Sequence, residues 1–293
     1  MNRGKVKIKE DRYPGRLKEI DDPPEDLYYK GNFDGEIFDK CLAVVGSRRM
    51  TKYGEKICTK LVSEVASRGI TIVSGFMYGM DATAHRAAVK VGGRTIAVMP
   101  CGIEKIHPGY QEDLYKEIIK KKGLILSEMP GKKGPAKWTY PKRNRIVAGL
   151  SQATLVVQAG KNSGSLITAN FAKDFNRKLF AVPGPLTSKV SIGTANLIKD
   201  GADIVTSAKD ILKFFEPKQA GMNFNKEDRK LDKYKNLPPK EKEIIKKLQT
   251  EPLEIDDIAR KLDLSAKKTG TILSQMQLKG LIEKEGNKYY LND

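Results

Sequence analysis

The chain is poor in the residues that build disulfides and metal centres. Its 293 residues include three cysteines and two histidines. Cys41, Cys58 and Cys101 are far apart and form no CxxC pair, the spacing that zinc sites and redox motifs use. We therefore expect no disulfide framework and no metal centre, and nothing in the motifs below calls for a cofactor.

Long apolar runs are also missing. No stretch approaches the roughly 20 apolar residues of a membrane-spanning helix, and the start, MNRGKVKIKE, lacks the apolar segment of a signal peptide. Hydrophobic residues make up 39% of the chain and charged residues 31%, which fits a globular protein with a sizeable core. These features predict a cytoplasmic protein that makes no membrane contact.

Acidic residues are too few to balance the basic ones, and the net charge is +18. Residues 1–40 carry 9 basic and 10 acidic side chains, residues 41–216 carry 28 and 13, and residues 217–293 carry 17 and 13. The window 116–145 alone holds 10 Lys or Arg against 2 Glu. A generally lysine-rich surface is the simpler explanation, but concentration in one window favours nucleic acid as the partner.

Short β-branched runs alternate with amphipathic stretches from residue 41 onward. This alternation predicts an α/β, Rossmann-like, doubly wound domain with a mostly parallel sheet over residues 41–216. The expected strands are 41–45, 70–74, 94–99, 124–128, 153–158, 178–183 and 203–206, and the expected helices are 53–68, 81–91, 110–121, 143–150, 165–175 and 194–200.

Three further segments complete the predicted organisation. Residues 1–40 are an extension that packs on the core, and residues 217–236, polar and without periodicity, are a linker. Residues 237–293 predict three helices and a hairpin around Glu285–Gly286–Asn287, the order of a winged helix. Its third helix, 265–279, carries Lys267, Lys268 and Lys279, so it could read DNA, although such modules also mediate protein contacts.

Ligands of open parallel sheets bind beyond the carboxyl ends of the strands, so the loops there are informative. The first strand is followed by Gly46, Ser47 and Arg48, and the fifth by Ser163, Gly164 and Ser165 at a helix start, where backbone amides and hydroxyls can hold phosphate. After the second strand comes SGFMYGMD, in which Asp81 either caps the next helix or serves the site. Neither G-x-G-x-x-G nor Walker A is present.

The stretch KWTYPKRNR adds aromatic rings among cations, a combination that stacks bases and holds the backbone of single strands. Its cations crowd the expected start of helix 143–150, where the helix dipole repels positive charge unless an anion binds there. Other interpretations stay open: Trp138 as a partly buried residue, Asn144 as a helix cap, and Arg143 or Arg145 as the partner of Asp81 or Glu128. The candidate residues here are Lys137, Trp138, Tyr140, Lys142, Arg143, Asn144 and Arg145.

Taken in order, these motifs resemble the DprA/Smf family of DNA-processing proteins. The resemblance rests on YPGRLKEIDDPPEDLYYKG, VVGSR, SGFMYGMD, GGRTIAVMPCG, YPKRNRIVAGLS, SGSLITA and VPG, followed by a winged-helix-like end. It differs from the family pattern at SGFMYGMD, where a loop arginine is lost, at Gln158, where many members have Glu, and at IHPG, where His107 replaces a tyrosine.

The resemblance implies a protein without catalytic residues that binds single-stranded DNA and helps load a RecA-type recombinase, notably in natural transformation. It also implies a homodimer formed through the Rossmann domain, and it assigns the DNA pocket to Arg48 and the stretch from Lys137 to Arg145, with Gly46, Ser47, Ser163, Gly164 and Ser165 beside them.

Two other functions remain open. One is a nucleotide phosphoribohydrolase, an enzyme class that shares this Rossmann variant and uses a glutamate in a P-G-G-x-G-T-x-x-E stretch; the comparable AGKNSGSLITA has no carboxylate. The other is a transcription regulator whose Rossmann domain senses a nucleotide while the winged helix reads duplex DNA.

Overall fold

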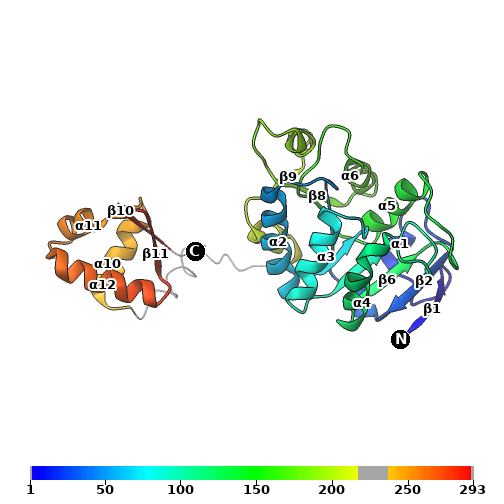
Figure 1. Cartoon of the computed structure of the whole chain (residues 1–293), viewed down its shortest axis with the longest axis horizontal. Helices are drawn as coiled ribbons and strands as arrows, with labels where there is room; N and C mark the ends of the chain where they lie inside the picture. The colour runs from blue at the N-terminus through cyan, green and yellow to red at the C-terminus, as the bar shows by residue number, and fades with distance from the viewer. Residues whose placement is uncertain (1, 217–236, 292–293) are drawn as a thin grey trace, which may run out of the picture. The chain divides into compact units, whose positions relative to one another are not determined.

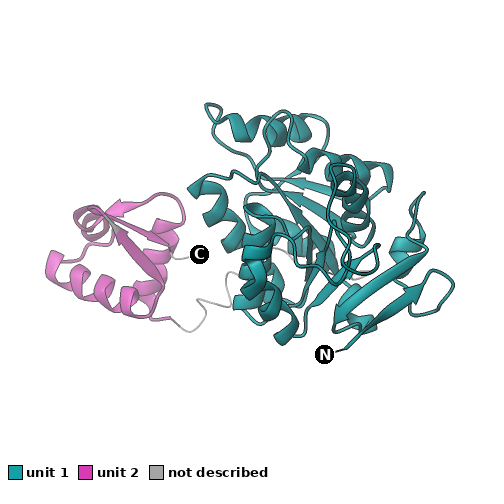
Figure 2. Ribbon diagram, turned by 45° about the vertical axis from the view of Figure 1, so that its right-hand side comes forward, with its two compact units in different colours: residues 1–217 teal, residues 218–293 magenta. Residues whose placement is uncertain are grey.

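The computed structural model describes residues 2–216 and 237–291, and the chain divides into two compact units, 1–217 and 218–293 (Figure 2). The predicted linker, 217–236, lies outside the described residues.

The first unit is built on one nine-stranded sheet (Figure 1). Its strand order is β1-β2-β6-β5-β4-β3-β7-β8-β9, and every pair from β6 to β9 is parallel. The predicted α/β doubly wound fold is therefore confirmed. The strands are β1 Arg3–Lys7, β2 Asp26–Gly31, β3 Cys41–Val45, β4 Thr71–Ser74, β5 Thr95–Val98, β6 Leu124–Ser127, β7 Ala153–Val156, β8 Lys178–Ala181 and β9 Asp203–Ile204.

Helices cover both faces of this sheet, which is why strands β3 to β7 are buried throughout. One face packs against α1 Gly15–Lys18, α5 Thr139–Gly149, α6 Ser165–Asp174 and α7 Ile192–Lys199. The other packs against α2 Lys52–Ser67, α3 Met80–Lys90, α4 Glu112–Lys120 and α8 Ala208–Phe215. Three short 3₁₀ turns, η1 Gly35–Phe38, η2 Gly109–Gln111 and η3 Lys189–Ser191, complete the unit.

The N-terminal extension forms part of the sheet. Strand β2 pairs antiparallel with β6, placing Tyr28 opposite Ser127, and β1 pairs antiparallel with β2 at the sheet's edge (Figure 1). The sequence analysis assigned no strand here. In DLYYKG, however, buried residues such as Leu27 and Tyr29 alternate with partly exposed ones, as in a strand. The segment therefore extends the sheet and does not only pack on its surface.

Helix α5 begins at Thr139, four residues before its expected start at residue 143. Pro141 obscured the beginning, but a proline within the first helical turn removes no intrahelical hydrogen bond and is tolerated. The cations therefore do not sit at the helix mouth: Lys142, Arg143 and Arg145 are the fourth, fifth and seventh helical residues. The predicted repulsion by the helix dipole is correspondingly weaker, because it falls off within the first turn.

The second unit confirms the predicted winged helix. Helices α10 Pro239–Leu248, α11 Ile255–Lys261 and α12 Ala266–Leu278 are followed by the hairpin β11 Ile282–Glu285 and β12 Lys288–Leu291. A short strand, β10 Leu253–Glu254, joins β12. Lys267 and Lys268 of α12 are exposed, whereas Lys279 pairs with Glu241 at 2.7 Å.

Candidate nucleic-acid interface

A cleft of about 590 Å³ opens at the carboxyl ends of β3, β4 and β7. Strand order reverses at β3, because the chain builds outward to β6 on one side and then to β9 on the other, and such a switch point leaves a crevice. Ten of the thirteen predicted site residues line this cleft: Gly46, Ser47, Arg48, Lys137, Tyr140, Arg143, Asn144, Ser163, Gly164 and Ser165.

Arg48 is the most prominent cation of the cleft. Its side chain is exposed, and its guanidinium carbon lies 5.1 Å from the centre of the Tyr140 ring and 5.8 Å from that of Tyr78. The ion pairs found among the described residues include neither Arg48 nor Lys137. Both cations are therefore available to an anion, and Arg48 is held by aromatic faces that could also accept a base.

His107 supports the Tyr140 ring from behind. Its Nε2 lies 2.9 Å from the Tyr140 hydroxyl, and the two rings meet edge to face at 6.2 Å. Burial lowers the pKa of His107, and the positive charges of Lys105, Arg48 and Arg143 lower it further. The imidazole is accordingly neutral at pH 7.

The start of helix α6 supplies an anion-friendly wall. Gly164 precedes the helix without a capping side chain, and the Ser163 and Ser165 hydroxyls are 2.8 Å apart beside the first backbone N–H groups. The Ser163 hydroxyl accepts from Ser165 N at 3.4 Å, and the N–H groups of Leu166 and Ile167 donate to the carbonyl oxygens of Ser163 and Gly164. The two hydroxyls and the positive end of the helix dipole therefore favour a phosphate at this position.

Two glycines allow the loops of the cleft to approach each other. A Cβ on Gly46 would lie 2.8 Å from Met80 Cγ and 2.9 Å from the Gln158 carbonyl oxygen. Gly79 has φ +78°, and a Cβ there would lie 2.4 Å from the Arg48 carbonyl oxygen. Gly46 is thus needed for packing, and Gly79 for the position of Arg48.

Arg143 forms the floor of the cleft and is only 5% exposed. Its guanidinium donates to the carbonyl oxygens of Gly75 and Val98. Burial lowers the pKa of Arg143 to about 10, opposed by Asp81. Burial also raises the pKa of Asp81, whose carboxylate accepts a 3.2 Å bond from Met77 N. Arg143 therefore joins the ends of β4 and β5 and also contributes positive charge.

Arg145 lies in the fold and lines no part of the cleft. It is 4% exposed, its Nη2 donates to Glu128 Oε1 at 2.6 Å, and its Nε donates to Asp22 Oδ2 at 2.9 Å. Lys142 Nζ lies 3.2 Å from the same Glu128 oxygen. The alternative considered from sequence, an arginine paired with Glu128, is the one that the structure shows.

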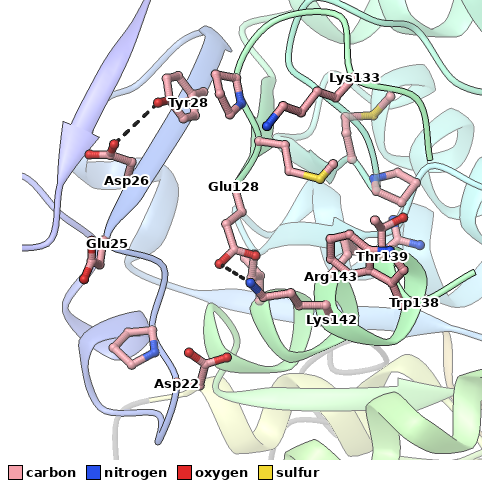
Figure 3. Close-up of a pocket in the computed structure, with 16 residues that line it drawn as sticks. Asp22, Glu25, Asp26, Tyr28, Glu128, Lys133, Trp138, Thr139, Lys142 and Arg143 are labelled. Carbon is pink, nitrogen blue, oxygen red and sulfur yellow. Dashed lines mark hydrogen bonds and ion pairs between the residues drawn. The ribbon is translucent and has the colours of Figure 1, made fainter. Parts of the chain in front are cut away.

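Trp138 and Lys142 face a second pocket, of about 500 Å³, on the other side of α5 (Figure 3). Trp138 is 63% exposed, so the alternative of a partly buried ring is wrong. Asn144 is not a cap either: it is the sixth residue of α5, and its Nδ2 donates to the Gly164 carbonyl oxygen at 3.4 Å.

Sequence reasoning missed several residues of the cleft. Arg49, Ile167 and Thr168 line it, and His107 stands behind it. Arg49 follows Arg48 directly and could have been included on that signal. The role of His107 depends on a contact across 33 residues, for which the sequence carried no local signal.

Over residues 2–216 and 237–291, no helix combines the length and apolarity needed to cross a membrane. Nor do these residues bring together three or more His, Cys, Asp or Glu side chains as a metal site would require.

Comparison with known proteins places both units. Residues 5–216 match the family described as DNA recombination-mediator protein A, and residues 231–288 match the DprA winged helix domain. The chain is 41% identical to protein Smf of Synechocystis over 205 residues, covering 68% of this chain and 51% of that protein. It is 40% identical to the DNA processing protein DprA of Bacillus subtilis over 206 residues, covering 70% and 69%.

Two solved structures share the fold. The crystal structure of DNA processing protein A from Streptococcus pneumoniae is 39% identical with a TM-score of 0.69, covering 74% of this chain and 75% of that one. That of the Helicobacter pylori protein, described for its single-stranded DNA binding mode, is 31% identical with a TM-score of 0.64, covering 72% and 95%. On the strength of the matched family, the ordered motifs and the shared fold, the chain belongs to the DNA recombination-mediator protein A family, also called DprA or Smf.

Proposed function

We propose that this protein binds single-stranded DNA in the cleft at the ends of β3, β4 and β7 and acts as a recombination mediator. The observation that carries the proposal is the arrangement of Arg48, Lys137 and Tyr140 around the start of α6, where the Ser163 and Ser165 hydroxyls lie. Unpaired cations and a helix N-terminus suit phosphates, and the exposed aromatic faces suit unpaired bases, which a duplex keeps stacked inside. The Helicobacter relative's described binding mode agrees with this choice.

Fluorescent single-stranded and duplex oligonucleotides of equal length, titrated across a salt series, test the proposal. We expect single strands to bind more tightly, with a slope of log affinity against log salt of about −0.7 per phosphate contacted. Arg48→Ala and Lys137→Ala should each weaken binding and flatten that slope by roughly 0.7. Lys120→Ala is the matched control, because Lys120 is an exposed cation at the end of α4 that leads into β6, away from the cleft. Preference for duplex, unaffected by Arg48→Ala, would contradict the proposal and favour the winged helix as the DNA reader.

The proposal assigns the protein a binding role and no catalysis. Asp81 is the one carboxylate that lines the cleft among the described residues, and its pKa is raised by burial. The described residues that line the cleft beside Ser163 and Ser165 include no glutamate, which a phosphoribohydrolase would need there. Incubation with nucleoside monophosphates should therefore release no free base; release abolished by Asp81→Asn would establish an enzyme instead.

Family membership supports two further parts of the proposal: loading of a RecA-type recombinase onto single-stranded DNA, and a homodimer formed through the Rossmann domain. The recombinase's DNA-dependent ATP hydrolysis on strands precoated with a single-strand-binding protein should start earlier when this protein is added. Light scattering should give about twice the 32.6 kDa mass of one chain. If ATP hydrolysis started no earlier, recombinase loading would be refuted. If light scattering gave the mass of a single chain, the homodimer would be refuted.

A further inference from the structure

The first turns of α5 form a ridge between two pockets. Lys137, Tyr140 and Asn144 face the cleft, whereas Trp138, Thr139 and Lys142 face the second pocket. This division follows the helical period, since residues three or four apart share a face. Arg143 is common to both linings, so the two pockets are neighbours separated by the thickness of one helix.

The second pocket has the dimensions and walls of a site for a small planar group. Its volume is about 500 Å³, within the range of small-molecule sites. Tyr28, Met99, Pro100 and Met129 give it apolar walls. Figure 3 shows Trp138, which immediately precedes α5, and Lys142, from α5, on one side. Glu25, Asp26 and Tyr28, from β2 and the segment before it, lie on the other.

Four carboxylates line this pocket, and three of them are compensated by ion pairs, whereas the ion pairs of the described residues do not include Glu25. Glu128 pairs with Arg145 and Lys142, Asp22 pairs with Arg145, and Asp26 pairs with Lys5 at 3.2 Å. An ionised carboxylate can accept about four hydrogen bonds, so each retains capacity. Such compensated acceptors suit a neutral donor such as an exocyclic amine, while the exposed cations at the rim disfavour a basic peptide.

Trp138 and Lys142 complete a site for a nucleotide. A tryptophan ring that is 63% exposed offers a stacking platform, and Lys142, 45% exposed at its side chain, stands one helical turn away. Lys133, also exposed, lines the same pocket. This is the pairing of ring and cations that single-strand-binding grooves use.

We infer that the second pocket binds a nucleobase of the same DNA strand that occupies the cleft, with Trp138 stacking on the base and the carboxylates favouring bases with an exocyclic amine. The strand crosses the α5 ridge between the two pockets. The inference rests on the proposed function of the cleft.

Trp138 is the only tryptophan in the chain, so its fluorescence reports on this pocket directly. We expect quenching on addition of single strands long enough to cross the ridge, stronger with oligo-dC than with oligo-dT of equal length. Trp138→Ala should weaken binding roughly tenfold, at the lower part of the range for loss of one base–aromatic stack, and Trp138→Phe should retain most of the affinity. Tyr110→Ala is the matched control, because Tyr110 is 73% exposed and lines neither pocket.

The outcomes separate this inference from the proposed function. Binding that depends on Arg48 but leaves Trp138 fluorescence and the Trp138→Ala affinity unchanged would overturn the second pocket and leave the cleft intact. No single-strand binding at all would overturn both. Quenching by a lysine-rich peptide and not by DNA would overturn the inference in favour of a protein partner.

Discussion

Replacing Arg145 by methionine distinguishes the structural role of Arg145 from the DNA-binding role proposed for Arg48. Arg145 is 5% exposed at its side chain and donates to Glu128, which is 22% exposed. Methionine keeps the length of the stem but removes the guanidinium. The substitution leaves a partly buried carboxylate without its closest partner, at 2.6 Å, and also removes the bond between α5 and Asp22 of the N-terminal segment.

The expected loss of stability can be estimated from these contacts. Removing one member of a buried ion pair costs about 3–5 kcal/mol. Glu128 keeps Lys142 at 3.2 Å and some solvent, so we expect the lower end, about 3 kcal/mol. For a unit of this size that corresponds to a melting temperature lower by about 6–12 °C. Arg145→Lys keeps the charge but loses the two-pronged geometry, so it should fall between wild type and methionine.

Circular dichroism during thermal and urea unfolding measures the loss of stability, and the salt-series titration with single-stranded DNA measures the change in DNA affinity. Arg48→Ala, which removes an exposed side chain, should change stability by no more than about 0.5 kcal/mol while weakening DNA binding. Arg145→Met should lower stability but leave DNA binding unchanged, provided that binding is measured at a temperature where the variant remains folded. If Arg145→Met left stability unchanged and flattened the salt slope by one phosphate contact, the structural role assigned to Arg145 would be refuted.

Three further predictions concern protonation and backbone. Burial lowers the pKa of His85 to about 3, so the unfolded chain takes up a proton below its ordinary pKa of 6.5 while the folded chain does not. Stability should therefore fall with pH from 6.5 towards 3, by roughly 2–3 kcal/mol at pH 4.5; urea unfolding should show this fall in wild type and not in His85→Gln, and equal falls in both would contradict it. The pKa of His107 is lowered by burial and nearby cations, and a bound phosphate would raise it, so DNA affinity measured by anisotropy should rise as the pH falls below 6.5, but not in His107→Gln. Gly79→Ala combines positive φ with a clash against the Arg48 backbone, costing about 1–3 kcal/mol, and should weaken DNA binding as much as Arg48→Ala does; unchanged affinity would show that the loop adapts.

Much of the architecture follows from local sequence because its signals are local. Each central strand is a short run of apolar residues bounded by polar loops, as in CLAVV and ATLVV, and both faces of such a run must be covered by helices. Gly46, Ser47 and Arg48 follow β3 directly, and residues 163–165 lie where the loop after β7 meets α6. A parallel sheet therefore brings both sets to one edge once the strands are correctly assigned.

Other features depended on partners that are distant in sequence. Strands β1 and β2 were missed because each buries only part of its residues, unlike the central strands, and so carries a weaker apolar signal. Within KWTYPKRNR all the cations look alike as residue types, and only the helix start at Thr139 and the acceptors Glu128 and Asp22 assign Arg145 to the fold and Lys137 to the cleft.

The sequence by itself thus determined the class of fold, the sheet edge at which the cleft opens and the positive charge of the loops that line it. The tertiary structure alone decided how the charges are used, because an arginine's role is set by the carboxylate or carbonyl it meets across the fold. Only the tertiary structure shows that one helix separates two pockets. The side chains of α5 point to different pockets because of the 3.6-residue helical period, and the sequence analysis had predicted the start of this helix four residues too late.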